Sequence, residues 1–600
     1  MTDFATPHRS AVPIERTWDP ESVFPTVAAW EAELEGVLAV LPSVAAFQGR
    51  LAGAPVVLAE ALAARDDLVR RLGHVFVYAM LGYAVETTDT EAVGRFGRAQ
   101  SVQAQAGAAV AFVEPEVLAI GREQLREWEL VEPVLAAYAH AFDDLFRREA
   151  HTRSAEIEEV LGLASDAFSG PFAVYSALTD SDLVFAPATP EAGEPAPVTQ
   201  GTIDALLAQP DRALRRSAWE SYADGYLNLR NALGANLANA IKQDVFSMRV
   251  RRHDSTLTAS LSRSNVPVRV FDNLIETFET NLPTWHRYWR VRRALLGVDV
   301  LCPFDVAAPL RDSPVELTYE QCVGWICDSL APLGGAYVDT VRRGCLEERW
   351  VDVDPTAGKM GGAFSSGAPG TMPFIVMNFD GTAVSLGTLA HELGHSMHSY
   401  LAWESQPQIY GNYSLFVAEV ASNFHQALLR AHLLDVADTE ELQFAVLEEA
   451  MANFYRYLFV MPTLARFERE LHEQVERGEG VTAELLIGRM ADLFAEGFGP
   501  DFELDRERIG ITWAQFGHLY EPFYVYQYAT GISGAHALAR GVLDGEPGAA
   551  ERYREFLSAG DSVDPLEALY QAGVDLSSPK PIEETFAVLA SFVDRLEALM

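Results

Sequence analysis

The chain has 600 residues, of which 49% are hydrophobic and 22% charged, the balance of a globular protein large enough for more than one domain. Its formal net charge of −40 argues against binding to nucleic acid or to an anionic membrane, because both need a basic surface. No run approaches the ~20 apolar residues of a membrane span, and the first 20 residues lack the apolar core of a signal peptide. The four cysteines form no Cys-x-x-Cys pair and are typical of reduced thiols in a cytosolic protein. We therefore expect a soluble, cytoplasmic protein.

Helical periodicity dominates the first 180 residues. The first clear pattern follows Pro25 and Thr26, which together indicate a helix start. Four prolines and Gly193 then crowd the segment 184–199, which indicates either a flexible linker or a surface hairpin with its turn near Gly193. We place a domain boundary near residue 200, so that residues 1–200 form an N-terminal helical domain and residues 201–600 a second, catalytic domain.

A basic island follows in the second predicted domain. It comprises Arg249, Arg251, Arg252 and His253. Because carboxylates greatly outnumber basic residues in this chain, we expect the island to pair with nearby acids and not to bind an anion.

A strand, a turn and a helix are predicted in succession between residues 373 and 400. The apolar run 373–379 reads as a strand, and Asp380-Gly381-Thr382 is a turn signal. From Ala383 the apolar residues recur at helical spacing. This arrangement is typical of a cleft whose edge strand can pair with an extended peptide backbone.

The predicted helix carries the sequence His391-Glu392-Leu393-Gly394-His395. Residues at i and i+4 lie one turn apart on the same helix face, so both imidazoles can reach one Zn²⁺. Glu392 would then stand beside a metal-activated water as general base. The pattern therefore predicts a metal-dependent hydrolytic site with His391 and His395 as two of its ligands.

A catalytic zinc ion needs a third protein ligand. The metzincin signature would place Gly at 398 and His at 401, but these positions hold His398 and Leu401, which excludes that class. The better candidate is Glu419, which opens a polar stripe on the next predicted helix. His398 and His425 compete for the role, and we expect each to line the cleft or to support a ligand instead.

The motifs together resemble oligoendopeptidase F, of the thimet-oligopeptidase-like zinc metallopeptidases. The resemblance is carried by the segments 358–367, 373–379, 389–399 and 419–422, and by Trp18-Asp19 and Phe24-Pro25 near the start. It thus extends over most of the chain. It implies a mainly α, multi-helical, two-domain metallopeptidase that encloses a deep cleft, with a small β element beside the zinc-motif helix.

The resemblance also assigns roles in the segment 516–531. His518 and Tyr524 match residues that stabilise the oxyanion, and Tyr528 matches a residue that contacts substrate. A neutral O–H or N–H aimed at developing negative charge can contribute several kcal/mol to transition-state stabilisation. From spacing alone this segment reads equally as a strand or as a helix with an aromatic stripe.

One position departs from the family pattern. The family commonly has an acidic residue seven positions after the ligand Glu419, where this chain has Gln426. An amide oxygen still accepts a proton from a ligand histidine but holds its charge less strongly than a carboxylate does. Either zinc binding is weaker here, or another acid such as Glu404 substitutes.

The leading interpretation is a zinc metalloendopeptidase that binds one Zn²⁺ per chain through His391, His395 and Glu419 and cleaves short, extended peptides. No nucleic-acid or membrane partner is expected, and the oligomeric state stays open. A zinc carboxypeptidase of similar helical architecture is a second interpretation. A non-catalytic peptide-binding protein that retains the metal motif is a third, and the intact Glu392 argues against it.

Overall fold

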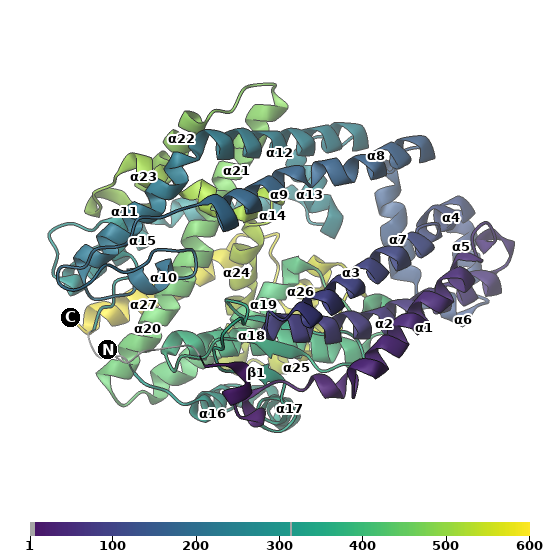
Figure 1. The fold of residues 1–600 in the computed structure, drawn as a ribbon, viewed down its shortest axis with the longest axis horizontal. Coiled ribbons are helices and arrows are strands. Elements are labelled where there is room, and N and C mark those ends of the chain that lie inside the picture. The colour runs from purple at the N-terminus through teal and green to yellow at the C-terminus, as the bar shows by residue number, and fades with distance from the viewer. Residues whose placement is uncertain (1–6, 312–314) are drawn as a thin grey trace. The chain divides into compact units, whose positions relative to one another are not determined.

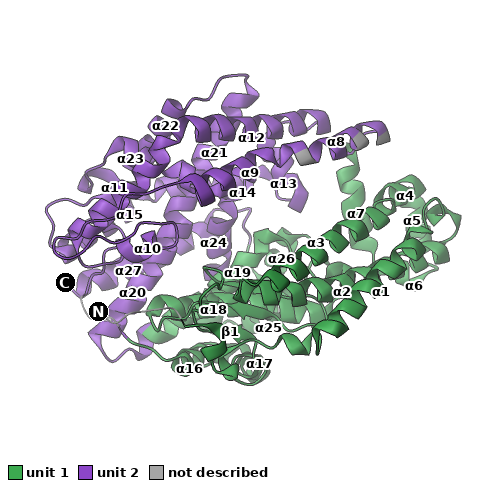
Figure 2. Ribbon diagram, in the orientation of Figure 1, with its two compact units in different colours: residues 1–150, 316–433, 538–574 green, residues 151–315, 434–537, 575–600 purple. Residues whose placement is uncertain are grey.

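The computed structural model describes residues 7–311 and 315–600, and most of them lie in α-helices (Figure 1). The predicted mainly α class is confirmed. The chain divides into two compact units, each made of three separate segments (Figure 2). Unit 1 comprises Met1–Ala150, Glu316–Leu433 and Leu538–Val574; unit 2 comprises His151–Val315, Leu434–Ala537 and Asp575–Met600. The boundaries of these units differ from the predicted domain boundary near residue 200, and that domain boundary stays a prediction.

Unit 1 holds both helices of the predicted metal site. The helix predicted after Thr26 begins at Val27, with the Thr26 side chain accepting a hydrogen bond from the N–H of Ala29. The last residues of α19 are counted with unit 2. The helices of unit 1 are α1 (Val27–Ala45), α2 (Pro55–Val85), α3 (Thr90–Val110), α4 (Val113–Ile120), α5 (Arg122–Glu129), α6 (Pro133–Ala136), α7 (Ala139–Arg148), α16 (Tyr319–Ser329), α17 (Gly335–Leu346), α18 (Ala383–Ser405), α19 (Leu415–Val436), α25 (Ala549–Ser558) and α26 (Pro565–Ala572).

A three-stranded sheet in unit 1 contacts the zinc-motif helix α18. Its strands are β1 (Val351–Asp352), β2 (Phe364–Ser366) and β3 (Phe374–Val376), in the order β1-β3-β2. β1 pairs with β3 in parallel and β2 pairs with it in antiparallel fashion. The strand predicted in 373–379 is therefore present, but as the central strand. The edge strand that contacts α18 is β2, from the glycine-rich segment before it.

A buried lysine holds the loop that leads into β2. The side chain of Lys359 is completely buried, and its Nζ lies 2.7 Å from Oδ1 of Asp352 in β1. The same nitrogen donates to the carbonyl oxygens of Asp352 and Asp354. Burial lowers the pKa of Lys359, while the adjacent Asp352 opposes that shift. Lys359 thereby ties the segment before β2 to the opposite edge strand.

Unit 2 contains the remaining helices and an aromatic core around Trp285, Trp289 and Phe459. The last residues of α24 are counted with unit 1. The helices of unit 2 are α8 (Ala155–Phe168), α9 (Gly170–Ser176), α10 (Ile203–Leu207), α11 (Arg212–Asn228), α12 (Arg230–Arg251), α13 (Thr256–Leu261), α14 (Val268–Thr280), α15 (Leu282–Leu296), α20 (Glu440–Tyr455), α21 (Met461–Glu476), α22 (Ala483–Phe498), α23 (Arg506–Gly510), α24 (Tyr526–Leu543) and α27 (Lys580–Ala598).

The proline-rich segment near residue 190 forms the predicted hairpin. Ala188 and Ala196 pair as an antiparallel bridge, with two reciprocal backbone hydrogen bonds of 2.8 Å. Gly193 lies between them with φ of 120°, a conformation that favours glycine. The alternative of a flexible linker is therefore wrong.

The basic island pairs within unit 2, as predicted. Arg251 forms an ion pair with Glu158 at 3.0 Å, and Arg249 donates to the carbonyl oxygen of Glu476 at the end of α21. The island therefore joins α12 to neighbouring helices of its own unit.

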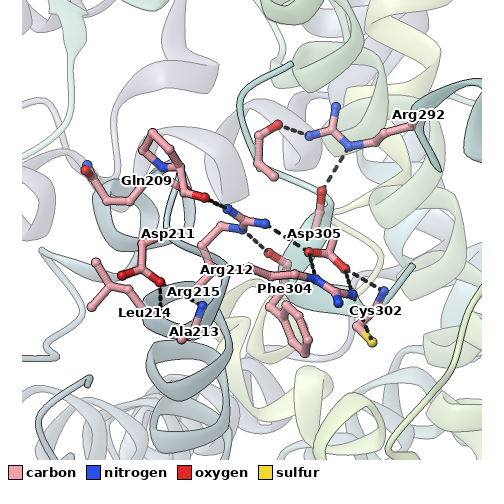
Figure 3. Close-up of polar contacts among 12 residues, drawn as sticks. Gln209, Asp211, Arg212, Ala213, Leu214, Arg215, Arg292, Cys302, Phe304 and Asp305 are labelled. Carbon is pink, nitrogen blue, oxygen red and sulfur yellow. Dashed lines mark hydrogen bonds and ion pairs between the residues drawn. The ribbon is translucent and has the colours of Figure 1, made fainter. Parts of the chain in front are cut away.

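A fully buried aspartate links α11 to the segment after α15 in unit 2 (Figure 3). Asp305 accepts from Arg212 at 2.7 Å, from Arg215 at 3.0 Å and from the N–H of Cys302 at 3.0 Å. Burial alone would raise the pKa of Asp305, but these donors hold it below its ordinary value. Arg292 of α15 donates to the backbone oxygen of Asp305. Because a buried charge without a partner is costly, these contacts fix the junction of the two helices.

Among the described residues, no single helix is long and apolar enough to cross a membrane. One pair, 90–120 with 122–129, meets the length and composition criteria when taken together, and it is bent by 96° between its two parts.

Candidate active site

The zinc-motif helix α18 starts at a well-formed cap. The hydroxyl of Thr382 accepts from the N–H of Ser385, and Asp380 accepts from the N–H and hydroxyl of Thr382. Gly381 takes a positive φ of 77° at this turn. The cap fixes the first turn of α18, so the positions of His391 and His395 follow from regular helix geometry.

The two histidines converge as the spacing predicts. Nε2 of His391 and Nε2 of His395 lie 3.2 Å apart. Oε2 of Glu419, from α19, lies 3.6 Å from Nε2 of His391. One ligand atom from each of the three residues lies within 4.8 Å of the other two, and this is the one such group of histidine, cysteine and carboxylate side chains found among the described residues. The predicted ligand set is thus brought together.

These distances fit a tetrahedral zinc ion. Two ligand atoms at about 2.05 Å from a tetrahedral Zn²⁺ lie about 3.3 Å apart, close to the separations of His391 from His395 and from Glu419. Burial lowers the pKa of His395 to about 3, which keeps its imidazole neutral and able to act as a ligand. Two imidazoles and one carboxylate are a donor set that zinc uses in hydrolases.

Gly394 allows α18 and α19 to approach closely enough for this arrangement. A Cβ at position 394 would lie 2.4 Å from the carbonyl oxygen of Ala421 and 2.6 Å from Cα of Ser422. The backbone of α19 therefore occupies the space that any larger residue would need. Sequence reasoning missed this role, and the signal for it is the glycine inside the motif.

Polar groups on α19 contact two of the predicted ligands. Nδ1 of His391 lies 3.1 Å from Oε1 of Gln426, so an N–H at Nδ1 can donate to the amide oxygen and leave Nε2 for a metal. Ser422 donates to Oε2 of Glu419 at 3.2 Å, and Asn423 donates to the same oxygen at 3.4 Å. Gln426 itself thus supports His391, whereas Glu404 is exposed.

Glu392 is buried beside the group formed by His391, His395 and Glu419. It is 6% exposed, and its Oε2 has no hydrogen-bond partner. Burial raises its pKa to about 7, with His391 opposing and Glu419 adding to the shift. A carboxylate with such a pKa is suited to take up and release a proton near neutral pH.

The edge strand β2 contributes to the setting of Glu392. The backbone N–H of Ser365 donates to the Glu392 carboxylate. The hydroxyl of Ser365 lies 2.8 Å from that of Ser396, which is fully buried in α18. Ser365 pairs with Ile375 in the sheet. The edge strand and the carboxylate are therefore held to each other, a contact that sequence reasoning did not anticipate.

The two competing histidines lie outside the ligand group, as predicted. His398 is buried and stacks on Tyr413, with ring centroids 3.6 Å apart. Nε2 of His425 lies 2.7 Å from the hydroxyl of Tyr337. Burial lowers the pKa of both histidines to about 3. Tyr413 also donates to the backbone oxygen of His395, so His398 supports the helix through that ring.

The three residues of the C-terminal segment form a group in unit 2. The ring of His518 lies 5.6 Å from that of Tyr524 and 6.0 Å from that of Tyr528. Tyr528 donates to the hydroxyl of Tyr524 at 3.3 Å and stacks on Tyr457. Burial lowers the pKa of His518, and its Nδ1 has no hydrogen-bond partner. The structure thus brings these three side chains together, and Tyr457 joins them without a signal in the sequence.

The segment is neither the strand nor the continuous helix that spacing allowed. Gly517–Tyr520 is a short 3-10 helix, and α24 begins only at Tyr526. Tyr524 lies between them, directly after Phe523, which has a left-handed φ of 55°. Tyr528 is therefore placed by α24 and His518 by the short 3-10 helix, whereas Tyr524 lies in the connection between them.

Comparison with known proteins identifies the class. The model of peptidase family M3 matches residues 205–588, and the model named oligopeptidase F matches residues 116–185. A mainly α fold whose zinc-motif helix lies beside a small sheet is, with these matches, that of a metallo-oligopeptidase. The chain belongs to peptidase family M3, and the resemblance to oligoendopeptidase F is confirmed.

Its relatives share nearly the whole length. The chain is 36% identical to oligopeptidase PepF of Bacillus subtilis over 99% of this chain and 88% of that protein. It is 30% identical to the plasmid oligoendopeptidase F of Lactococcus lactis over 99% and 98%. The crystal structure of oligoendopeptidase F from Enterococcus faecium matches with a TM-score of 0.74 and 27% identity, over 95% of this chain and 98% of that one. A structure from Chlamydophila abortus matches with a TM-score of 0.88 and 29% identity, over 99% and 100%.

Proposed function

We propose that this metallo-oligopeptidase is a zinc-dependent endopeptidase that hydrolyses internal bonds of short peptides, with Glu392 as general base. The observation that carries the proposal is the convergence of His391, His395 and Glu419, with their ligand atoms within 4.8 Å and a buried Glu392 beside them. The relatives named oligoendopeptidase F support an internal cleavage of oligopeptides.

Each residue of the metal group has a distinct task. One Zn²⁺ per chain, held by His391, His395 and Glu419, would activate a water molecule and polarise the scissile carbonyl. Glu392 accepts a proton from the attacking water and passes it to the leaving nitrogen. The N–H of Ser365 holds the Glu392 carboxylate during both transfers.

Charge that develops on the carbonyl oxygen requires hydrogen-bond donors. Tyr524 and His518 supply a neutral O–H and N–H for this role, and Tyr528 contacts substrate. Their mutual proximity in unit 2 supports the assignment. Burial lowers the pKa of His518, so its ring is neutral and carries one N–H. One N–H is enough to donate a hydrogen bond to an oxyanion.

The expected partners follow from the proposed endopeptidase function. Short, extended peptides are the substrates, and neither nucleic acid nor membrane is a partner, in line with a net charge of −40. A cytoplasmic location remains a prediction.

Replacement of Glu392 by glutamine tests the general base. Glu392→Gln keeps the size of the side chain and leaves the metal ligands in place, so zinc content should be unchanged. The kcat for a quenched fluorescent peptide should fall by about 10²- to 10⁴-fold, since proton transfer contributes that much. Glu404→Gln, on the exposed face of the same helix, is the matched control and should keep full activity.

Two results would contradict the proposal. Full activity of a zinc-loaded Glu392→Gln protein would show that Glu392 is not the general base. Wild-type protein that takes up no zinc would contradict the proposed metal site. Peptides blocked at both ends separate the alternatives: the endopeptidase cleaves them, whereas a carboxypeptidase needs a free C-terminal carboxylate. A protein that binds these peptides without cleaving them would be the non-catalytic alternative.

A further inference from the structure

The residue before Tyr524 is held in an unfavourable conformation by a buried carboxyl group. Phe523 has a φ of 55°, which a bulky residue rarely adopts because its Cβ crowds the backbone. Its N–H donates to Oε1 of Glu468, in α21, at 2.6 Å. Glu468 is only 2% exposed. Strained backbone that persists at such a position is characteristic of functional sites.

The ring of Phe523 is fixed as firmly as its backbone. The side chain is 1% exposed and lies 4.7 Å from the ring of His472, one turn beyond Glu468 on α21. It also meets Phe271 of α14 edge to face. Val525, on the other side of Tyr524, is fully buried. Tyr524 is therefore a partly exposed residue between two buried anchors.

His472 faces an acceptor at each ring nitrogen. Nδ1 lies 2.9 Å from the backbone oxygen of Glu468, and Nε2 lies 3.3 Å from Oδ2 of Asp244 in α12. Neither acceptor can donate, so the contacts are satisfied together by an imidazolium with two N–H groups. Burial opposes this charge, but Asp244 and Glu468 raise the pKa of His472 above its ordinary value. The ring that supports Phe523 is thus anchored to both α12 and α21.

One oxygen of the Glu468 carboxyl group accepts the hydrogen bond from the N–H of Phe523. Its second oxygen, Oε2, has no hydrogen-bond partner. Burial raises its pKa to about 8, while the adjacent His472 opposes that shift. A buried carboxyl with an unsatisfied oxygen costs stability. The contact that it does make is to the residue next to Tyr524.

We propose that Glu468 is a positioning residue that acts through Phe523 to place the hydroxyl of Tyr524, with His472 supporting the ring of Phe523. The inference rests on the proposed role of Tyr524 and extends it to residues 50 or more positions earlier in the chain. Loss of the Glu468 acceptor releases the left-handed conformation, and the Tyr524 side chain then leaves its productive orientation.

A double-mutant cycle tests the inference. Glu468→Leu removes the acceptor and should lower kcat by about 10- to 100-fold, as misplacement of a group by about 1 Å does, with KM within about threefold and zinc content unchanged. In a Tyr524→Phe background the same substitution should lower kcat by less than about twofold, since the group that it positions is already absent. Glu468→Gln keeps an acceptor oxygen and should retain kcat within about threefold.

Matched controls separate positioning from loss of folding. Glu470→Leu changes another carboxylate of α21, which pairs with Arg489, and should leave kcat unaltered. If Glu468→Leu does not fold, Glu468→Asp, which withdraws the carboxyl by one methylene, takes its place in the cycle with the same expected non-additivity.

Three outcomes overturn the inference. Wild-type kcat in Glu468→Leu would show that the contact is not needed. An equal loss in both backgrounds would show that Glu468 acts independently of Tyr524. Wild-type kcat in Tyr524→Phe would remove the role of Tyr524 and this inference with it, while the metal site and Glu392 would stand or fall separately on the Glu392→Gln experiment.

Discussion

At the scale of single residues, Gln426 lies behind the proposed ligand His391. Its amide oxygen lies 3.1 Å from Nδ1 of His391, at a position where the resemblance to oligoendopeptidase F leads us to expect a carboxylate. An amide oxygen accepts the hydrogen bond and fixes the ring, but it brings no negative charge to balance a metal cation. Gln426 therefore orients the ring of His391 without adding a negative charge beside it.

Substitution at Gln426 should change zinc affinity in both directions. Gln426→Leu removes the acceptor and should weaken zinc binding by about 10- to 100-fold, whereas Gln426→Glu should strengthen it, because a carboxylate attracts the charge that zinc induces on His391. Competition with a chromophoric chelator measures both affinities. Gln443→Leu, in α20 of unit 2, is a control that should bind zinc like the wild type. Equal affinities in all four proteins would show that the contact to His391 does not support the metal.

At the scale of helices, the site depends on how closely α18 and α19 approach. His391 and His395 are placed by one helix alone, so their convergence follows from an i, i+4 spacing. Glu419 reaches them only because Gly394 leaves room for the α19 backbone. Of the three proposed ligands, His391 and His395 are brought together by one helix, whereas Glu419 is brought to them by the packing of two helices.

Gly394→Ala should disturb this approach. The new methyl group would meet the carbonyl oxygen of Ala421 at 2.4 Å, and backbone cannot move aside as a flexible side chain can. We expect a loss of about 1 to 3 kcal/mol in the free energy of unfolding, the typical cost of overpacking, together with weaker zinc binding. Urea denaturation and zinc titration measure the two effects.

The control for this substitution lies in the same unit. Gly97, within α3, has open space where a Cβ would be added. Gly97→Ala should be neutral or stabilising by up to about 1 kcal/mol, since alanine is the better helix former. If Gly394→Ala behaves like Gly97→Ala, close packing at the motif glycine is not what sets the position of Glu419.

At the scale of the whole molecule, the parts that could be predicted from sequence are those with local causes. The mainly helical class, the strand before α18, the hairpin near Gly193 and the pairing of His391 with His395 all follow from periodicity or spacing within short windows. Two contacts could not be predicted in this way. The N–H of Ser365 donates to Glu392, 27 positions later, and the N–H of Phe523 donates to Glu468, 55 positions earlier. No local pattern in the sequence indicates either contact. The two compact units likewise combine segments that are distant in the chain.

Because all three proposed ligands belong to unit 1, zinc should protect that unit selectively. A ligand that binds only the folded state stabilises it by about 2.7 kcal/mol when its free concentration is 100 times Kd. Hydrogen exchange in α18 and α19 should therefore be slower with zinc than without it, because the metal would link these two helices. Helices α12 and α15 of unit 2 supply no ligand, and their exchange rates should remain unchanged. Glu419→Gln should abolish most of the protection, and protection spread equally over both units would contradict a metal site confined to unit 1.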